Sequence, residues 1–394
     1  MSNTSFFVEV DACLRSKSHE PVCGDYFVSK KIKSEQRVVA TLSDGLGSGI
    51  KANVLATMTA TMAICFTERN EPIQYTAESI MRTLPIDSVR QISYATFTII
   101  DIEPGGETKV VEYGNPNSIV MRGGKQWQPK YEKICFQTFD GKTRELNSYS
   151  FAAQKEDRII CFTDGVSQSG IGTKSMPFGW EAEGVTQFAT DQLAKNPKLS
   201  ASELSRKIVE RSYVNDTLKH RDDTSCAVIY FRNPRKMLVC TGPPFDKSRD
   251  AAYVKQVESF QGHKIVCGGT TSQIIARALN REIEVSLDSV SHLPPSSRME
   301  GFDLITEGII TLGKVVYYLE KLKSSQIQET DPAAEIVRLF FESDIIVFIL
   351  GTKINNAHQD PSLPVELEIR RNVVKKIVAL LEGKFLKEVQ MHFI

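Results

Sequence analysis

The sequence lacks the features that mark zinc proteins, disulfide-rich secreted proteins and nucleic-acid-binding proteins. Its 8 cysteines form no C-x-x-C pair and most lie in apolar runs, which favours reduced core thiols over zinc ligands or disulfides. Lysine plus arginine and aspartate plus glutamate both number 48, so the formal net charge is +0 and no block of like charge offers a surface for nucleic acid.

Targeting and membrane signals are also missing from the sequence. The first residues show no basic start followed by a long apolar run, so they do not form a signal peptide. Apolar stretches such as "DIIVFILG" (344–351) are too short to span a bilayer. We therefore expect a cytoplasmic protein that binds neither a membrane nor nucleic acid.

The informative feature that is present is a set of aspartates beside small residues at predicted strand ends. Strand-end carboxylates can meet although they are far apart in sequence, and divalent cations relieve their mutual repulsion. Oxygen-only ligands suit magnesium or manganese better than zinc, so the pattern predicts a two-metal hydrolytic site. The residues are Asp25 in "VCGDYF", Asp44 in "VVATLSDGLGSG", Asp164 in "RIICFTDGVSQSG" and Asp222 in "RDDTS".

Two of these aspartates are followed directly by glycine. In "SDGLGSG" (43–49), Gly45 allows a tight turn and leaves its carbonyl free to face a cation, although Asp-Gly turns are common without any metal. Asp164-Gly165 repeats the arrangement. Asp222 and Asp223 are adjacent, so their side chains are expected to point to opposite faces and one of them to reach the metals.

The hydrophobic patterns predict two domains with different organisation. Strands are expected at 6–13, after Asp25 and at 37–43, then a helix pair from Ile50, a β-rich run, a second helix pair and a closing strand. This order indicates an α+β sandwich with outer helices over 1–233. After "RNPR" (232–235), strands alternate with helices, which predicts a small α/β domain over 234–394.

The combination Gly24-Asp25, Asp44-Gly45, Asp164-Gly165 and Asp222-Asp223-Thr224 resembles the signature of PPM-type metal-dependent serine/threonine phosphatases. "SDGLGSG" before a Thr/Met/Ala-rich helix, and "EYGNPNSIVMRGG" (112–124), are similar to the stage II sporulation protein E subgroup. The resemblance covers about residues 5–232. It implies a four-layer α/β/β/α sandwich, two Mn²⁺ or Mg²⁺ ions, and hydrolysis of phosphoserine or phosphothreonine by a metal-activated water.

The resemblance also assigns roles to single residues. Asp44 would bridge the two ions, Asp25 and the Gly45 carbonyl would bind one ion, and Asp164 and Asp222 would bind the other. Asp222 matches the family motif better than Asp223. The implied substrate is a bacterial phosphoprotein, such as a phosphorylated anti-sigma-factor antagonist.

The resemblance further implies a helical switch over 50–84, although the apolar stripe Ile50, Val54, Met58, Met62 and Cys65 is by itself expected to face the core.

Other residues near the expected site remain open to two interpretations. Eukaryotic relatives carry a phosphate-binding arginine and a histidine acid near the first strand, and the candidates here are Arg15, Lys17 and His19, which could equally form a solvated loop. The glycine- and serine-rich segment 165–179 could be a surface loop or a flap over the site.

In the second domain, "CGGTTSQ" (267–273) could bind an anion at a helix start, with contributions from "TEGIITLG" (306–313) and "TGPPFDK" (241–247). Capped helices and turns explain the same segments, and neither a Walker nor a G-x-G-x-x-G motif is present.

Two other functions are therefore weighed. A non-catalytic phosphatase-fold regulator, whose C-terminal domain binds a ligand or a partner, is the alternative, but such a protein is free to lose the aspartates that this chain keeps. An aspartyl-phosphate hydrolase needs a D-x-D motif, which Asp44-Gly45-Leu46 lacks.

Overall fold

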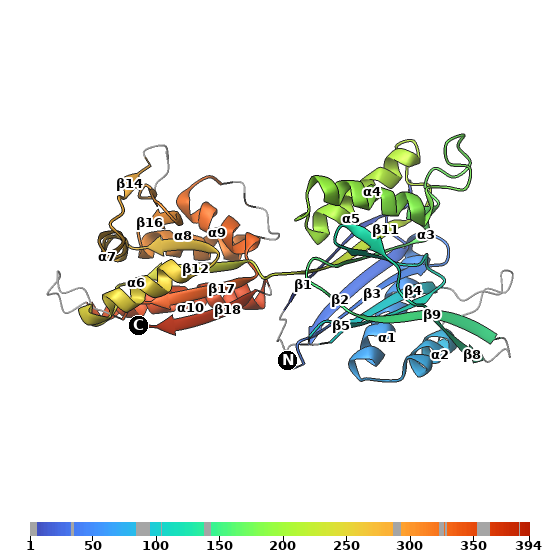
Figure 1. The fold of residues 1–394 in the computed structure, drawn as a ribbon, viewed down its shortest axis with the longest axis horizontal. Coiled ribbons are helices and arrows are strands. Elements are labelled where there is room, and N and C mark those ends of the chain that lie inside the picture. Colours follow the sequence, from blue (N-terminus) through green and yellow to red (C-terminus); the bar gives the residue numbers. More distant parts are fainter. Residues whose placement is uncertain are drawn as a thin grey trace. The chain divides into compact units, whose positions relative to one another are not determined.

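The computed structural model contains two compact units, Met1–Asn233 and Pro234–Ile394 (Figure 1). Each unit is considered by itself. The structure describes residues 6–32, 35–83, 95–103, 105–137, 143–286, 293–322, 327, 329–352, 363–385 and 387–394. Leu84, which ends the helical switch expected over 50–84, lies outside these ranges.

The first unit is built around two antiparallel sheets. The β1 sheet has the strand order β1-β11-β10-β6-β7, and the β2 sheet has the order β2-β3-β4-β5-β9-β8. The strands of the β1 sheet are β1 (Phe7–Arg15), β11 (Thr224–Arg232), β10 (Arg158–Phe162), β6 (Ile119–Arg122) and β7 (Lys125–Trp127). Those of the β2 sheet are β2 (Asp25–Ile32), β3 (Arg37–Gly45), β4 (Ala95–Ile102), β5 (Glu107–Tyr113), β9 (Thr143–Ala152) and β8 (Glu132–Gln137).

Helices cover the outer faces of both sheets (Figure 1). Helices α4 (Glu181–Lys195) and α5 (Ala201–Asn215) pack on the β1 sheet, and α1 (Gly49–Glu68) and α2 (Ile73–Thr83) pack on the β2 sheet. A separate apolar cluster, including Leu42 and Ile229, fills the space between the sheets. The unit therefore has helix, sheet, sheet and helix layers, and the mixed α+β organisation predicted from the sequence is confirmed.

Helix α1 turns the opposite face to the sheet from the one that its apolar periodicity predicts. Ile50, Val54 and Met58 are 65%, 50% and 42% exposed, whereas the face toward the sheet consists mainly of small residues such as Ala52 and Ala56. The expectation that the stripe is core is therefore wrong. Small residues let the helix backbone approach β3 closely, which bulky side chains on that face would prevent.

Helix α1 also qualifies the membrane expectation. Among the described residues it alone has the length and hydropathy of a membrane span, and 39% of that window is buried inside the protein. A helix that packs on a sheet can pass the same test, and α1 contacts β2, β3 and β4. Composition alone therefore does not assign this helix to a membrane.

The second unit contains a mostly parallel sheet. Its strand order is β14-β15-β16-β13-β12-β17-β18, in which β16, β13, β12, β17 and β18 are parallel neighbours. In chain order these five strands run 3-2-1-4-5, the doubly wound arrangement with helices on both faces. The strands are β12 (Lys236–Thr241), β13 (His263–Cys267), β14 (Glu284–Val285), β15 (Ser297–Met299), β16 (Phe302–Thr306), β17 (Ile345–Leu350) and β18 (Glu388–Phe393).

The helices of this unit divide between the two faces of the sheet. An apolar cluster joins the strands to α8, α9 and α10, and a second cluster joins them to α6 and α7. Their bounds are α6 (Asp250–Ser259), preceded by the short η1 (Lys247–Arg249), α7 (Gly269–Leu279), α8 (Ile309–Lys321), α9 (Pro332–Glu342) and α10 (Leu363–Gly383). The predicted α/β character of this region is confirmed.

Candidate metal centre

The fold brings the aspartates singled out in the sequence to one end of the two sheets. Asp25 opens β2 and is the register partner of Asp44 on β3. Asp164 is the first residue of the short helix α3 (Asp164–Ser167), directly after β10, and Asp222 and Asp223 directly precede β11, the antiparallel partner of β10. Each sheet therefore contributes carboxylates from neighbouring strand ends.

A threonine connects the two groups of carboxylates. Thr163 Oγ1 donates a hydrogen bond to Asp25 Oδ2 at 2.9 Å and accepts one from the backbone N–H of Ser225 at 3.1 Å. Thr163 is fully buried, so this contact fixes the β10–β11 end of one sheet against the start of β2 in the other. The sequence interpretation missed Thr163, although its position immediately before Asp164 was a usable signal.

Burial and mutual repulsion perturb the carboxylates strongly. Burial, followed by the charges of Asp25 and Asp164, raises the pKa of Asp44 to about 10. Burial is also the main cause that raises the pKa of Asp25 to about 7. Burial and the neighbouring negative charges therefore disfavour the simultaneous ionisation of Asp25, Asp44 and Asp164.

The outer members of the cluster show the same direction of change. Burial raises the pKa of Asp164 above its ordinary value, and Gln168 Nε2 donates a hydrogen bond to Asp164 Oδ2 at 3.0 Å. The pKa of Asp222 is raised by burial and then by the charge of Asp164. Lys17 Nζ lies 3.9 Å from Asp222 Oδ1, and its charge lowers the pKa of Asp222 by less than burial and Asp164 raise it.

Asp222 and Asp223 approach the cluster from different sides. Asp222 interacts electrostatically with Asp44 and Asp164, whereas Asp223 interacts with Asp25. Asp223 is 4% exposed, and its Oδ2 has no hydrogen-bond partner. Its Oδ1 accepts from the backbone N–H of Lys17 at 3.0 Å. The preference for Asp222 over Asp223 as a metal ligand stays a prediction.

The glycines that follow two of the aspartates are required by close backbone contacts. A Cβ on Gly45 would lie 2.0 Å from the carbonyl oxygen of Ala52 in α1, and a Cβ on Gly165 would lie 2.0 Å from that of Asp223. Since neither contact can accommodate a side chain, each glycine lets a neighbouring segment reach the carboxylates. This requirement exists independently of any role for the Gly45 carbonyl.

The donor set fits divalent cations. Asp25 Oδ1 and Asp223 Oδ2 are both buried without a hydrogen-bond partner, and a buried carboxylate oxygen is costly unless a cation or a donor satisfies it. Within the ranges that the structure describes, no three His, Cys, Asp or Glu side chains are arranged as a metal site.

The three candidate phosphate-binding residues do not occupy equivalent positions. Lys17 lies at the carboxylate cluster. Arg15 donates from Nη1 to the backbone carbonyl of Leu14 at 3.1 Å, and His19 forms no hydrogen bond or ion pair with a described residue. Of these three residues, Lys17 is therefore the one that lies at the carboxylate cluster.

The segment 165–179 that follows Asp164 is anchored at several points. The backbone N–H of Gly170 donates to Asp216 Oδ1 at 2.7 Å, and Arg221 Nη1 donates to the carbonyl of Ile171 at 3.0 Å. Phe178 in the same segment is 76% exposed. Whether it acts as a flap stays a prediction.

Comparison with known proteins supports a family assignment for the first unit. The profile described as "Stage II sporulation protein E (SpoIIE)" matches residues 34–232, which include Asp44, Asp164, Asp222 and Asp223 but not Asp25. A search of curated proteins found no match.

Solved structures of the PP2C phosphatase type are also similar. A SpoIIE structure from Bacillus subtilis, containing the PP2C phosphatase domain and a fragment of the regulatory domain, shares 15% identity with a TM-score of 0.45 and covers 58% of this chain. This chain spans 64% of the length of that one.

The RsbU and RsbW domains of a Mycobacterium tuberculosis protein share 14% identity with a TM-score of 0.44, covering 64% of this chain and 67% of that chain. RsbX in complex with magnesium shares 16% identity with a TM-score of 0.40, covering 57% and 95%. These likenesses are too distant to transfer an activity. The profile match, which spans half of the sequence, shows that this chain belongs to the SpoIIE family of PPM-type (PP2C) phosphatase domains.

Proposed function

We propose that the first unit is a metal-dependent phosphatase that hydrolyses phosphoserine or phosphothreonine on a regulatory protein. The observation that carries the proposal is the meeting of Asp25, Asp44 and Asp164 at one end of two sheets, with the pKa of Asp44 raised to about 10. Structural ion-pair networks usually match carboxylates with cations. This cluster has one lysine at its edge and leaves buried carboxylate oxygens unpartnered.

Each residue of the cluster has a definable task in this proposal. Asp44, at the centre, would contact both of two Mn²⁺ or Mg²⁺ ions, with Asp25 and the Gly45 carbonyl on one side and Asp164 and Asp222 on the other. Bound there, such a pair of ions lowers the pKa of a water and neutralises charge on the phosphoryl oxygens. Thr163 keeps Asp25 oriented, and Lys17 supplies a positive charge for an incoming phosphate.

The physiological substrate follows only by analogy. We infer a phosphoprotein of the anti-sigma-factor-antagonist type, acting with this enzyme in the cytoplasm. The solvent-exposed position of Lys17 at the cluster edge, with a side chain 42% exposed, is compatible with a substrate that presents its phosphate from outside.

Activity measurements on single substitutions test the proposal. With an aryl phosphate and with phosphopeptides, wild-type protein should turn over only when Mn²⁺ or Mg²⁺ is added. Asp44→Asn and Asp164→Asn should each lower kcat/KM by more than about a hundredfold, since loss of outer-shell partners alone costs about ten- to a hundredfold. Asp191→Asn, which changes an exposed aspartate on α4, is the matched control and should retain activity.

Two outcomes would reject the enzymatic proposal. One is full activity of both cluster variants, and the other is turnover that persists in excess chelator. If the wild type binds a phosphoprotein tightly but never hydrolyses it, the non-catalytic regulator becomes the better interpretation.

A further inference from the structure

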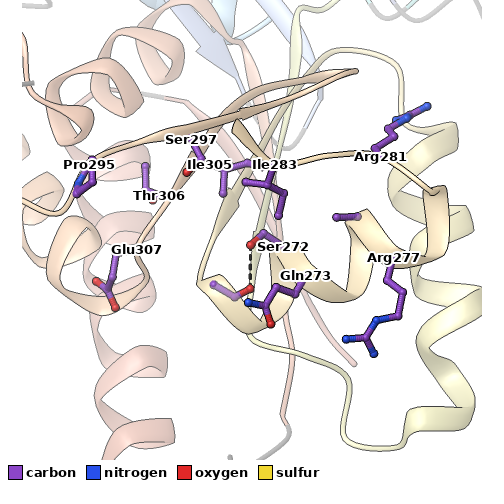
Figure 2. Close-up of a pocket in the computed structure, with 12 residues that line it drawn as sticks. Ser272, Gln273, Arg277, Arg281, Ile283, Pro295, Ser297, Ile305, Thr306 and Glu307 are labelled. Carbon is purple, nitrogen blue, oxygen red and sulfur yellow. Dashed lines mark hydrogen bonds between the residues drawn. The ribbon is translucent and has the colours of Figure 1, made fainter. Parts of the chain in front are cut away.

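The second unit contains a cavity of about 560 Å³ between α7 and residues of β15 and β16 (Figure 2). Arg277 and Glu307 line it on opposite sides, so charges of both signs face the same space. Such a lining does not select a ligand of one charge. The surface that points to a particular partner lies instead in the first unit, beside the carboxylate cluster.

Four exposed apolar side chains lie where helix α5 ends and in the segment that follows α3. Single exposed apolar residues are normal on a protein surface, whereas groups of them mark interaction sites. The apolar patch consists of Ile171, Tyr213, Val214 and Leu218, which are 43%, 38%, 54% and 61% exposed.

Hydrogen bonds hold the two parts of the apolar patch together. The N–H of Leu218 donates to the carbonyl of Tyr213 at 2.9 Å, within the turn that ends α5. Arg221, just after that turn, donates from Nη1 to the carbonyl of Ile171 at 3.0 Å. Asp216, which is 3% exposed, accepts from the backbone N–H of the residue before Ile171 at 2.7 Å. These contacts fix the segment 165–179 against the end of α5, so the patch is a preformed surface.

The backbone of Leu218 has a conformation that the end of the helix does not require. The N–H of Thr217 donates to the carbonyl of Val214 at 3.1 Å, which together with the bond from Leu218 to Tyr213 forms a turn that needs one left-handed residue. Thr217, with φ of 60°, is that residue, but Leu218 has φ of 63° as well. Because most of Leu218 is in solvent, burial does not compensate for this conformation. Residues held in this way concentrate at functional sites.

The apolar patch is continuous with the proposed metal centre through a positively charged stretch. In the chain, the exposed residues Lys219 and Arg221 lie between Leu218 and Asp222, and Lys17 Nζ lies 3.9 Å from Asp222 Oδ1. The Cα atoms of Leu218 and Asp222 are at most about 14 Å apart, since four residues separate them in the chain. One short segment of a partner can therefore place a phosphate at the carboxylate cluster and an apolar side chain on the patch.

We propose that the apolar patch is a docking surface for the phosphoprotein substrate. This substrate carries a large apolar side chain within about four residues of its phosphorylated serine or threonine. Leu218 and Tyr213 contact that side chain, and Lys219 and Arg221 attract the negatively charged phosphate. The inference rests on the proposed function, because it takes the metal centre as the position of the phosphate. The patch lies beside the reacting atoms, so it acts on substrate binding and not on the chemical step.

A matched pair of peptides tests the proposal on the full-length protein. Each peptide has one phosphoserine; the first has leucine at the third and fourth positions on both sides of it, and the second has glutamine there. In Mn²⁺ the wild type should hydrolyse the leucine peptide with a kcat/KM about tenfold higher, through a lower KM. Fluorescein-labelled versions, with a phosphonate in place of the phosphate, report binding in Mn²⁺ by fluorescence anisotropy, independently of turnover.

Leu218→Asn is the main variant, because asparagine adopts the left-handed conformation readily and the protein should stay folded. It should bind the leucine phosphonate peptide about tenfold more weakly and lose the preference for leucine over glutamine. Its turnover of p-nitrophenyl phosphate, which is too small to reach the patch, should be unchanged. Leu218→Met should keep the preference. Tyr75→Gln removes an exposed apolar side chain from α2, on the other sheet, and should behave as the wild type does.

Equal binding of the two phosphonate peptides to the wild type would overturn the proposal, as would an unchanged preference in Leu218→Asn. If such a protein still hydrolyses p-nitrophenyl phosphate, the phosphatase proposal stands and only the docking surface is rejected. A protein that is inactive on every phosphate, yet prefers the leucine phosphonate peptide through Leu218, would support the docking surface and reject the phosphatase proposal.

Discussion

Substituting Asp44 should stabilise the metal-free protein, although Asp44 is at the centre of the proposed active site. The reason is that Asp44 is crowded by Asp25 and Asp164, and its pKa is raised to about 10 from an ordinary value of 3.8. In the unfolded chain the same carboxyl ionises near pH 4. Between these two values the folded protein retains a proton that the unfolded chain has lost.

The sign and size of the effect follow from this difference in bound protons. Because the folded state binds more protons, the free energy of unfolding must fall as pH rises. The Asp44 contribution is fully present below about pH 4 and is lost as pH rises toward 10, and that of Asp25 is lost by about pH 7. Each retained proton lowers the unfolding free energy by at most about 1.4 kcal/mol per pH unit.

Asp44→Asn removes this penalty, because an amide does not ionise. Between pH 4 and pH 7 the penalty amounts to at most about 4 kcal/mol for one proton. An amide left with unpaired hydrogen-bonding groups would cost about 1–3 kcal/mol. We therefore expect the variant to be about 1–3 kcal/mol more stable than the wild type at pH 7 in chelator, and no more stable at pH 4.

Tryptophan fluorescence during urea unfolding is a suitable measurement. The chain has 2 tryptophans, Trp127 and Trp180, and both lie in the first unit, so the signal follows that unit. Unfolding curves would be recorded at pH 4, 5, 6, 7 and 8 in chelator, and again in Mn²⁺. Mn²⁺ should stabilise the wild type, since ligands that bind the folded state stabilise it. In Mn²⁺ the wild type should therefore have the larger free energy of unfolding, whereas in chelator the Asp44→Asn variant should have the larger one.

Asp101→Asn is the matched control, because Asp101 lies on β4 in the same sheet but has a cation partner. Arg37 Nη2 lies 2.6 Å from its Oδ2, and Arg37 is 5% exposed. Removing that carboxylate leaves the buried Arg37 guanidinium with only the longer ion pair to Glu35, at 3.6 Å, and should cost about 1.5–3 kcal/mol. If Asp44→Asn protein is less stable than wild type at pH 8 in chelator, or has an equally steep pH dependence, the carboxylates do not repel one another as described.

Two further substitutions test the elements that hold the site together. Gly165→Ala places a Cβ 2.0 Å from the Asp223 carbonyl oxygen and should destabilise the first unit by about 1–3 kcal/mol, whereas Gly313→Ala on α8 should leave the fluorescence-detected transition unchanged. Thr163→Val removes the donor to Asp25. The variant should need an Mn²⁺ concentration about ten- to a hundredfold higher than the wild type does to reach the same stabilisation. Thr163→Ser should respond to Mn²⁺ as the wild type does, and equal behaviour of the valine and serine variants would show that the hydroxyl is unimportant.

The sequence places the carboxylates at strand ends, and three of them, Asp44, Asp164 and Asp222, border buried apolar strands. Since β3 is buried from Val38 to Ser43 and β10 throughout, such strands are visible as continuous apolar runs, and the residue that follows them must lie at a sheet end. The pairing of Asp25 with Asp44 also follows from two adjacent strands with a short connection. The contact between sheets through Thr163 could not be predicted, because periodicity does not specify which strand ends oppose each other.

The second unit shows a different limit. Its central strand, β12, follows the unit boundary directly at Lys236–Thr241, and the sequence interpretation assigned no strand there. With β12 missing, the doubly wound order could not be recognised, and neither could the position of "CGGTTSQ" at the carboxyl end of the sheet.

Helix α1 shows why hydrophobic periodicity can select the wrong face of a helix. Burial depends on how closely two backbones approach, and the close contact between Ala52 and Gly45 leaves no volume for a large side chain on that face. Alanine and threonine then form the buried stripe, while Ile50 and Val54 remain at the surface. The same contact places the start of α1 against the residue that follows Asp44. A helix packed this tightly fixes the position of the carboxylate, so the small residues that weaken the apolar signal are the ones that hold the proposed metal centre in place.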